Sequence, residues 1–122
     1  MIVRDEHDWR ALHELVLAVQ RRFEWSYDAY CLMSSHFHLL TRAPLPRVSK
    51  GMHWLNGTYA HRFNRRWGRT GHLFEGRFDA WVMRDERHWE RTSRYILDNP
   101  VKAGICEFAD DWPWSGGRLS RR

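Results

Sequence analysis

Two histidines within an apolar run set the strongest limit on how this chain folds. His36 and His38 lie in the segment from Tyr30 to Leu40 and are separated only by Phe37. Side chains alternate between the faces of a β-strand, so a strand here places both imidazoles on one face and the phenylalanine on the other. Neutral imidazole is a common ligand of divalent metals. The pair predicts a metal site; two half-buried histidines that pack in a sheet are the alternative.

Length, charge and cysteine content narrow the class of protein. The chain has 122 residues, which suffices for one hydrophobic core, so we expect a single domain over residues 1–122. Its net charge of +5 and isoelectric point near 9.8 favour an anionic partner such as nucleic acid. Cys31 and Cys106 form no zinc-binding pattern, which favours a reduced cytoplasmic protein. No apolar stretch approaches the ~20 residues of a membrane span, and no signal peptide is expected.

Three segments have the periodicity of amphipathic helices. In residues 6–25 and 48–67, apolar side chains recur every three or four positions. The third segment, residues 86–97, ends before a proline because the residue that precedes proline avoids the helical region. Polar or glycine caps stand where these helices begin or end: Asp5, Gly68 and Asp85.

Two segments are candidate strands. The histidine run predicts one strand over residues 28–41, which Pro44 and Pro46 prevent from pairing further. Another strand is expected over residues 79–83, after a glycine-rich loop. Together with the three helices, these strands predict an α+β fold in which helices pack on a small antiparallel sheet.

Residues 61–78 combine arginines with aromatic rings. Five arginines stand against Glu75 alone, which gives this stretch a formal balance of +4. Cations that bind phosphates and ring faces that stack on bases are typical of single-strand binders. A solvated helix end with core aromatics is the alternative. The expected nucleic-acid contacts are Arg62, Arg65, Arg66, Trp67, Arg69, His72 and Arg77.

One tyrosine is predicted to be accessible beside the histidines. Tyr95 lies about 100° around the third helix from Ile96, which belongs to its buried stripe. Tyr59 falls within the apolar stripe of residues 48–67. Tyr30 is expected on the histidine face of the strand, but at ~3.3 Å per residue it lies too far away to reach the same metal. Tyr95 is therefore the reachable hydroxyl; an aromatic at the domain's edge is the alternative.

Further motifs extend the histidine pattern along the chain. They are His36-Phe37-His38-Leu39-Leu40, Leu55-Asn56-Gly57-Thr58-Tyr59, Phe63-Asn64-Arg65-Arg66, Gly68-Arg69-Thr70-Gly71-His72-Leu73-Phe74-Glu75-Gly76-Arg77-Phe78 and Arg94-Tyr95-Ile96-Leu97-Asp98-Asn99-Pro100-Val101-Lys102-Ala103-Gly104. In combination they resemble the Y1 transposases of the HUH superfamily, in particular the REP-associated tyrosine transposases, relatives of the IS200/IS605 enzymes. The resemblance covers nearly the whole chain, including residues 111–115.

This resemblance implies a fold, a reaction and a site. The fold would be the family's ferredoxin-like or RRM-like domain. The reaction would be the cleavage and joining of single-stranded hairpin DNA through a 5′-phosphotyrosine, with no organic cofactor. Tyr95 would be the nucleophile, and His36 and His38 would bind Mg²⁺ or Mn²⁺. Asn99 matches the place where relatives supply a further polar metal ligand.

The chain departs from the family at its beginning. Members usually start with an additional strand that carries a histidine, and this sequence lacks it, so we expect an N-terminally shortened member. The missing strand would leave an unpaired sheet edge beside the histidines. Such an edge could pair with a second copy of the chain, so both a monomer and a homodimer stay open.

Two functions of different classes also stay open. The first is an active DNA-cleaving and joining enzyme, which the complete set of His36, His38 and Tyr95 favours. The second is a domesticated or truncated protein that binds hairpin DNA without turnover, which the missing strand favours. A histidine-dependent nucleotide hydrolase is excluded because Leu40 stands where that chemistry needs another histidine.

Overall fold

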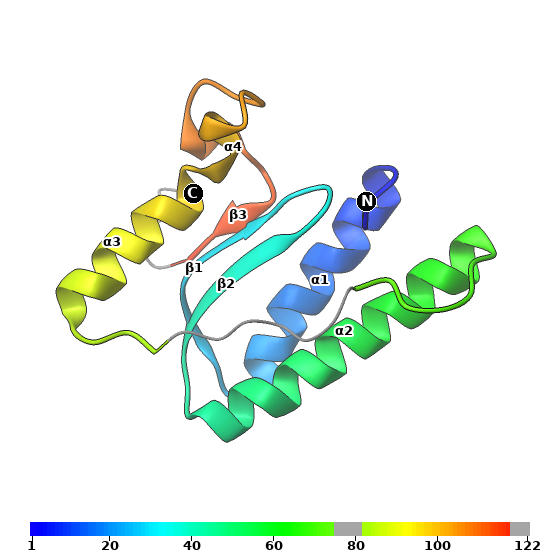
Figure 1. Cartoon of the computed structure of the whole chain (residues 1–122), viewed down its shortest axis with the longest axis horizontal. Helices are drawn as coiled ribbons and strands as arrows, with labels where there is room; N and C mark the ends of the chain where they lie inside the picture. The colour runs from blue at the N-terminus through cyan, green and yellow to red at the C-terminus, as the bar shows by residue number, and fades with distance from the viewer. Residues whose placement is uncertain (75–81, 118–122) are drawn as a thin grey trace. The chain divides into compact units, whose positions relative to one another are not determined.

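A computed structural model describes residues 1–74 and 82–117 (Figure 1). Within these ranges it contains four α-helices and a three-stranded antiparallel sheet, which confirms the predicted α+β class. The chain divides into two compact units, Met1–Trp25 with Ala43–Ala80, and Ser26–Arg42 with Trp81–Arg122. The single domain expected over residues 1–122 stays a prediction. No helix in the described part of the chain is long and apolar enough to cross a membrane.

Two long helices make up the first unit (Figure 1). Helix α1 spans Glu6–Arg22 and α2 spans Leu45–Trp67, so both predicted helices are confirmed. Helix α1 ends three residues earlier than expected, and α2 begins three residues earlier. The side chain of Asp5 caps α1 by accepting a hydrogen bond from the N–H of Asp8. Gly68 ends α2 in the left-handed conformation, with φ of 63°, which only glycine adopts without strain.

The core of the first unit lies between its helices. The buried side chains of α1 are Leu12, Leu15, Val16 and Val19, and those of α2 include Met52, Leu55, Tyr59 and Phe63. Trp25 seals one end of this core, and its indole N–H donates to the carbonyl of Arg47 at 3.1 Å. Gly51 allows this contact, because a Cβ atom there would lie 2.3 Å from the tryptophan ring.

A β-hairpin begins the second unit. The single strand expected over residues 28–41 is wrong, because β1 spans Ser26–Leu32 and β2 spans Phe37–Arg42. The chain reverses between them, and the N–H of Met33 donates to the carbonyl of His36 at 2.8 Å. The apolar residues on both sides concealed a turn whose signal was the two small polar residues at 34 and 35.

The register of the hairpin decides which side chains share a face. His38 lies opposite Cys31, and Tyr30 lies opposite Leu39. Directly paired residues of an antiparallel ladder project to the same side. Tyr30 is therefore on the face opposite His38, contrary to the expectation that it shares the histidine face.

The remaining elements of the second unit complete the sheet and cover it. Helix α3 spans Glu86–Leu97, as predicted, and α4 spans Asn99–Lys102; a 3-10 turn at Ala109–Asp111 leads to β3, Ser115–Gly116. The strand order is β2-β1-β3. The strand expected over residues 79–83 lies partly outside the described residues, and Val82 and Met83 are not in a strand.

Helix α3 packs on the face of the sheet that carries His38. The cluster buried there combines Ile96 of α3 with the hairpin residues Ala29, Cys31, Met33 and Leu40.

Arg42 connects the hairpin to α3 through ion pairs. It contacts the buried carboxylate of Asp28 at 2.9 Å and Glu86 of α3 at 2.7 Å. Its guanidinium lies 4.3 Å from the ring of Trp89, also on α3. Apolar and ionic contacts together thus fix α3 against the histidine face.

Candidate functional site

The two histidines lie side by side in the second unit. His38 belongs to β2, whereas His36 ends the turn that precedes it. Their ring centroids are 5.0 Å apart, with an angle of 79° between the ring planes. His36 is exposed and His38 is half-buried. The proximity expected from the sequence is present, although a strand supplies only one of the two side chains.

The environment favours neutral imidazole at His38. Partial burial and, to a lesser extent, the charge of His36 lower the pKa of His38 below its ordinary value. Neutral imidazole is the form that binds metal ions. At His36, the hydroxyl of Ser35 lies 3.0 Å from Nδ1, an interaction that leaves Nε2 available for another partner.

Tyr95 lies on α3 with its side chain in solvent. It is 57% exposed, whereas Tyr59 is 1% exposed and donates its hydroxyl to the carbonyl of Ile2 at 2.6 Å. The adjacent Ile96 is buried in the cluster beneath α3. Of these two tyrosines, only Tyr95 presents a hydroxyl that a large substrate could reach.

Helix α4 places two more side chains beside Tyr95. The amide nitrogen of Asn99 donates to the carbonyls of Tyr95 and Ile96, both at 3.3 Å. The ammonium of Lys102 lies 4.4 Å from the centroid of the Tyr95 ring. Lys102 was not predicted as a site residue, although its spacing of seven residues from Tyr95, about two helical turns, was a signal for this contact.

The two imidazoles supply part of the ligand set that a divalent transition-metal ion needs. Two imidazoles 5.0 Å apart can supply two nitrogen ligands to one ion. Imidazole binds first-row transition ions more readily than Mg²⁺, so this pair fits Mn²⁺ better. The described residues contain no group of three His, Cys, Asp or Glu side chains that could hold a metal. A third protein ligand would have to be of another type, such as the side-chain oxygen of Asn99.

Several residues that were expected to contact DNA instead bind other side chains of the first unit. Arg66 contacts Asp5 at 2.6 Å and Asp8 at 2.7 Å, and the indole N–H of Trp67 donates to Asp8 at 2.9 Å. These hydrogen bonds raise the pKa of Arg66, and the hydrogen bond from Arg66 is the main cause that lowers the pKa of Asp5 to about 2. Arg66 and Trp67 thus join the end of α2 to the start of α1.

Two aromatic rings of this region, Phe63 and Trp67, are poorly placed for base stacking. Phe63 is 2% exposed, so a base cannot stack on it. The guanidinium groups of Arg66 and Arg4 lie 4.5 and 5.0 Å from the ring of Trp67. Arg69 donates to the side-chain oxygen of Asn64 at 2.7 Å. Phe63 and Trp67 therefore belong to the packing of this unit, whereas Phe78 lies outside the described residues.

Other members of the expected set remain exposed. Arg62, Arg65 and His72 are exposed, and none of them forms an ion pair within residues 1–74 and 82–117. Arg77 lies outside the described residues.

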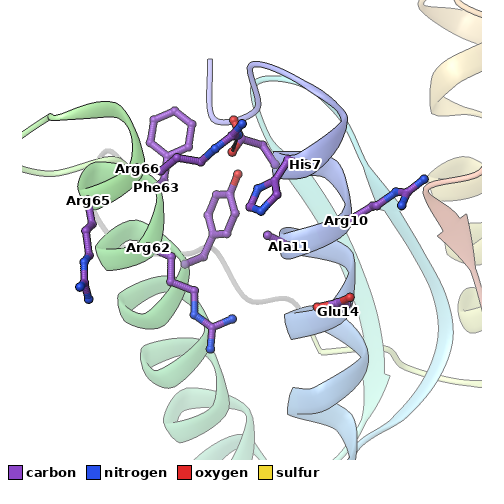
Figure 2. A pocket seen from close by; sticks show the side chains of 10 residues that line it. His7, Arg10, Ala11, Glu14, Arg62, Phe63, Arg65 and Arg66 are labelled. Atoms are coloured by element: carbon purple, nitrogen blue, oxygen red, sulfur yellow. Dashed lines mark hydrogen bonds and ion pairs between the residues drawn. The ribbon is translucent and has the colours of Figure 1, made fainter.

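An open groove of about 660 Å³ runs between α1 and α2 (Figure 2). Figure 2 shows Arg62 extending between the two helices, whereas Arg65 points away from α1. The groove is lined by His7, Asp8, Arg10, Ala11, Glu14, Tyr59, Arg62, Phe63, Arg65 and Arg66. Because Asp8 is paired with Arg66, the other basic residues make the lining cationic overall.

Comparison with known proteins connects this geometry to a family. A family model described as "Transposase IS200 like" matches residues 2–99 of the chain. A protein of Haemophilus influenzae, whose name describes it as a REP-associated tyrosine transposase, is 28% identical over 98 residues. The match covers 71% of this chain and 56% of that protein, so the chain spans about half the length of this relative. No solved structure matches the chain.

Proposed function

Because the chain belongs to the IS200-like family of Y1 transposases, we propose that it cleaves and rejoins single-stranded DNA that forms hairpins. One observation carries this proposal. The paired histidines lie at the sheet face on which α3 packs, and α3 presents the exposed Tyr95. A candidate nucleophile and a candidate pair of metal ligands thus occur within one compact unit.

In the proposed reaction, the phenolic oxygen of Tyr95 attacks the phosphorus of a phosphodiester. A new O–P bond forms, the bond to the 3′-oxygen breaks, and the 3′-oxygen takes up a proton while the phenol loses one. The products are a 5′-phosphotyrosine and a free 3′-hydroxyl. Attack by another 3′-hydroxyl reverses the step and joins the strands without an external energy source.

His36 and His38 would hold a divalent cation, Mn²⁺ or Mg²⁺, with Asn99 as a candidate third ligand. A cation bound there would polarise the phosphate and compensate its developing charge. The contribution of the protein is to hold the two imidazoles close together, and the half-burial of His38 favours the neutral form of that side chain.

The DNA strand would be held by the exposed cations of the first unit. Arg62, Arg65 and His72 are the candidates for phosphate contacts, since they have no ion-pair partner among the described residues. The ferredoxin-like arrangement, the REP-associated type of substrate, action as a monomer or homodimer, and a cytoplasmic location belong to the same proposal.

A hairpin-DNA binder without turnover is the second candidate. The observation that supports it is the set of exposed cations, since Arg62, Arg65 and His72 form no ion pair among the described residues. In such a protein the cations would still bind DNA, and the histidines and Tyr95 would have no chemical role.

Trapping of the covalent intermediate separates the two candidates. Wild-type protein, Tyr95→Phe and Tyr59→Phe are each incubated with labelled hairpin DNA and Mn²⁺ and then denatured in detergent. We expect a covalent protein–DNA band from the wild type and from Tyr59→Phe, and none from Tyr95→Phe. Tyr59→Phe is the matched control because its hydroxyl is buried and serves packing. Hairpin binding by a wild type that forms no band would favour the binder.

A further inference from the structure

Lys102 is placed to control the orientation of the candidate nucleophile. Its ammonium lies over the face of the Tyr95 ring, 4.4 Å from the centroid. Both side chains are exposed, so burial does not force this contact. None of the ion pairs among the described residues involves Lys102. The contact with Tyr95 is the interaction that the structure gives its ammonium.

The backbone holds the two residues at a fixed spacing. The N–H of Lys102 donates to the carbonyl of Asp98 at 3.0 Å, and the N–H of Asp98 donates to the carbonyl of Arg94 at 3.0 Å. The Asn99 amide also bonds to the carbonyl of Tyr95. Helix α4 thus follows directly after the end of α3. This arrangement places the side chain of Lys102 over the ring of Tyr95.

A solvent-exposed tyrosine ring ordinarily samples several rotamers, and only some of them would point the hydroxyl at a phosphate. A cation on the ring face favours one orientation through its attraction to the π electrons. On the basis of the proposed function, we propose that Lys102 is a positioning residue that holds the Tyr95 ring ready for attack. Its charge, and not only its hydrocarbon stem, is required for this role.

The rate of covalent-adduct formation at saturating hairpin DNA tests this role. We expect Lys102→Met to lower the maximal rate by roughly threefold to tenfold while DNA affinity stays within twofold, since misorientation affects attack and not binding. Lys102→Arg retains a cation and should restore most of the rate. Lys50→Met, which removes an exposed lysine of α2, is the matched control and should behave as the wild type.

A spectroscopic measurement detects the contact between Lys102 and Tyr95 independently of DNA cleavage. Lys50 and Lys102 are the only lysines in the chain, so [¹³C]lysine labelling gives two ε-methylene signals, and Lys50→Met assigns them. The signal of Lys102 should be shifted upfield by the ring current of Tyr95. The shift should persist in Tyr95→Phe, which keeps the ring, and disappear in Tyr95→Leu.

The outcomes distinguish this proposal from the proposed function. An upfield signal that survives Tyr95→Leu, or a Lys102→Met variant that changes DNA affinity alone, would overturn the positioning role while adduct formation by the wild type upheld the nuclease. A wild type that forms no adduct would overturn both the nuclease and the role of Lys102 in it.

Discussion

The contact between the start of α1 and the end of α2 uses polar and aromatic residues differently from the region around the two histidines and Tyr95. In the first unit, Arg66 and Trp67 are bound to Asp5 and Asp8. In the second unit, the most chemically capable side chains are exposed or half-buried, and they include His36, His38, Tyr95 and Lys102. One set of side chains is saturated by internal partners, whereas the other can still interact with a substrate.

This difference shows why charge along the sequence is an incomplete guide to binding. Arg65 and Arg66 are neighbours in an arginine-rich stretch, and both were predicted to contact DNA. Only Arg66 meets a carboxylate that is 3% exposed at its side chain, and it cannot leave that carboxylate without cost. A residue that already has a buried partner is a poor candidate for a ligand contact, whatever its type.

The largest effect is expected at the histidines. His36→Ala or His38→Ala should lower metal-dependent nicking by at least about 100-fold, because a direct ligand should matter at least as much as the outer-shell partners of metal sites. Hairpin binding should stay within a few-fold of the wild type, as measured by a gel-shift assay. His53→Ala is the control, since His53 is exposed on α2. Nicking at the wild-type rate in either variant would contradict the assignment of His36 and His38 as metal ligands.

Two substitutions on α2, Arg66→Ala and Arg65→Ala, compare an arginine that has a buried partner with one that has none among the described residues. Arg66→Ala should lower the melting temperature, on the order of 5 °C, because the buried Asp8 loses its cation. Arg65→Ala should leave the melting temperature unchanged and reduce the slope of log affinity against log salt by about 0.7 for single-stranded DNA. The reverse pattern, with Arg65 needed for stability and Arg66 for the salt slope, would contradict the division between saturated and available cations.

The smallest effect is a pH dependence of the cluster at Asp5. The hydrogen bond from Arg66 is the main cause that lowers the pKa of Asp5 from 3.8 to about 2. A lowered pKa in the folded state means that the stabilisation is complete above pH 4 and is lost as the pH falls toward 2. Urea midpoints measured between pH 5 and 2 should therefore fall more steeply for the wild type than for Asp5→Asn, which retains a good N-cap. Equal slopes would show that the pair adds no stability.

Much of the fold could be predicted because its signals are local. The three long helices follow from apolar periodicity, and Asp5, Asp85 and Gly68 cap them as expected. The hairpin turn was missed because its four residues lie within an apolar run. Strand β3 was missed because two residues carry no periodicity, and they pair with β1 more than 80 positions earlier.

The site was predictable to a similar degree. Adjacency in the sequence brought the histidines together, even though only His38 lies in a strand. The exposure of Tyr95 followed from its place on the helix. The pairing of Arg66 could not be predicted, since Asp5 and Asp8 lie about 60 positions away and only the packing of α1 on α2 makes them neighbours.

The short turn between β1 and β2 has a consequence for how such a site can evolve. The chain reverses within a few residues, and the bond between Met33 and His36 closes this turn directly before β2, which carries His38. Point changes at Ser34 or Ser35 would leave the spacing of the imidazoles intact, because both residues are exposed there. A shift of β2 by one residue against β1 would instead turn His38 to the other face of the sheet. The length of the turn and the register that it sets therefore constrain the candidate metal site more than the identity of Ser34 does.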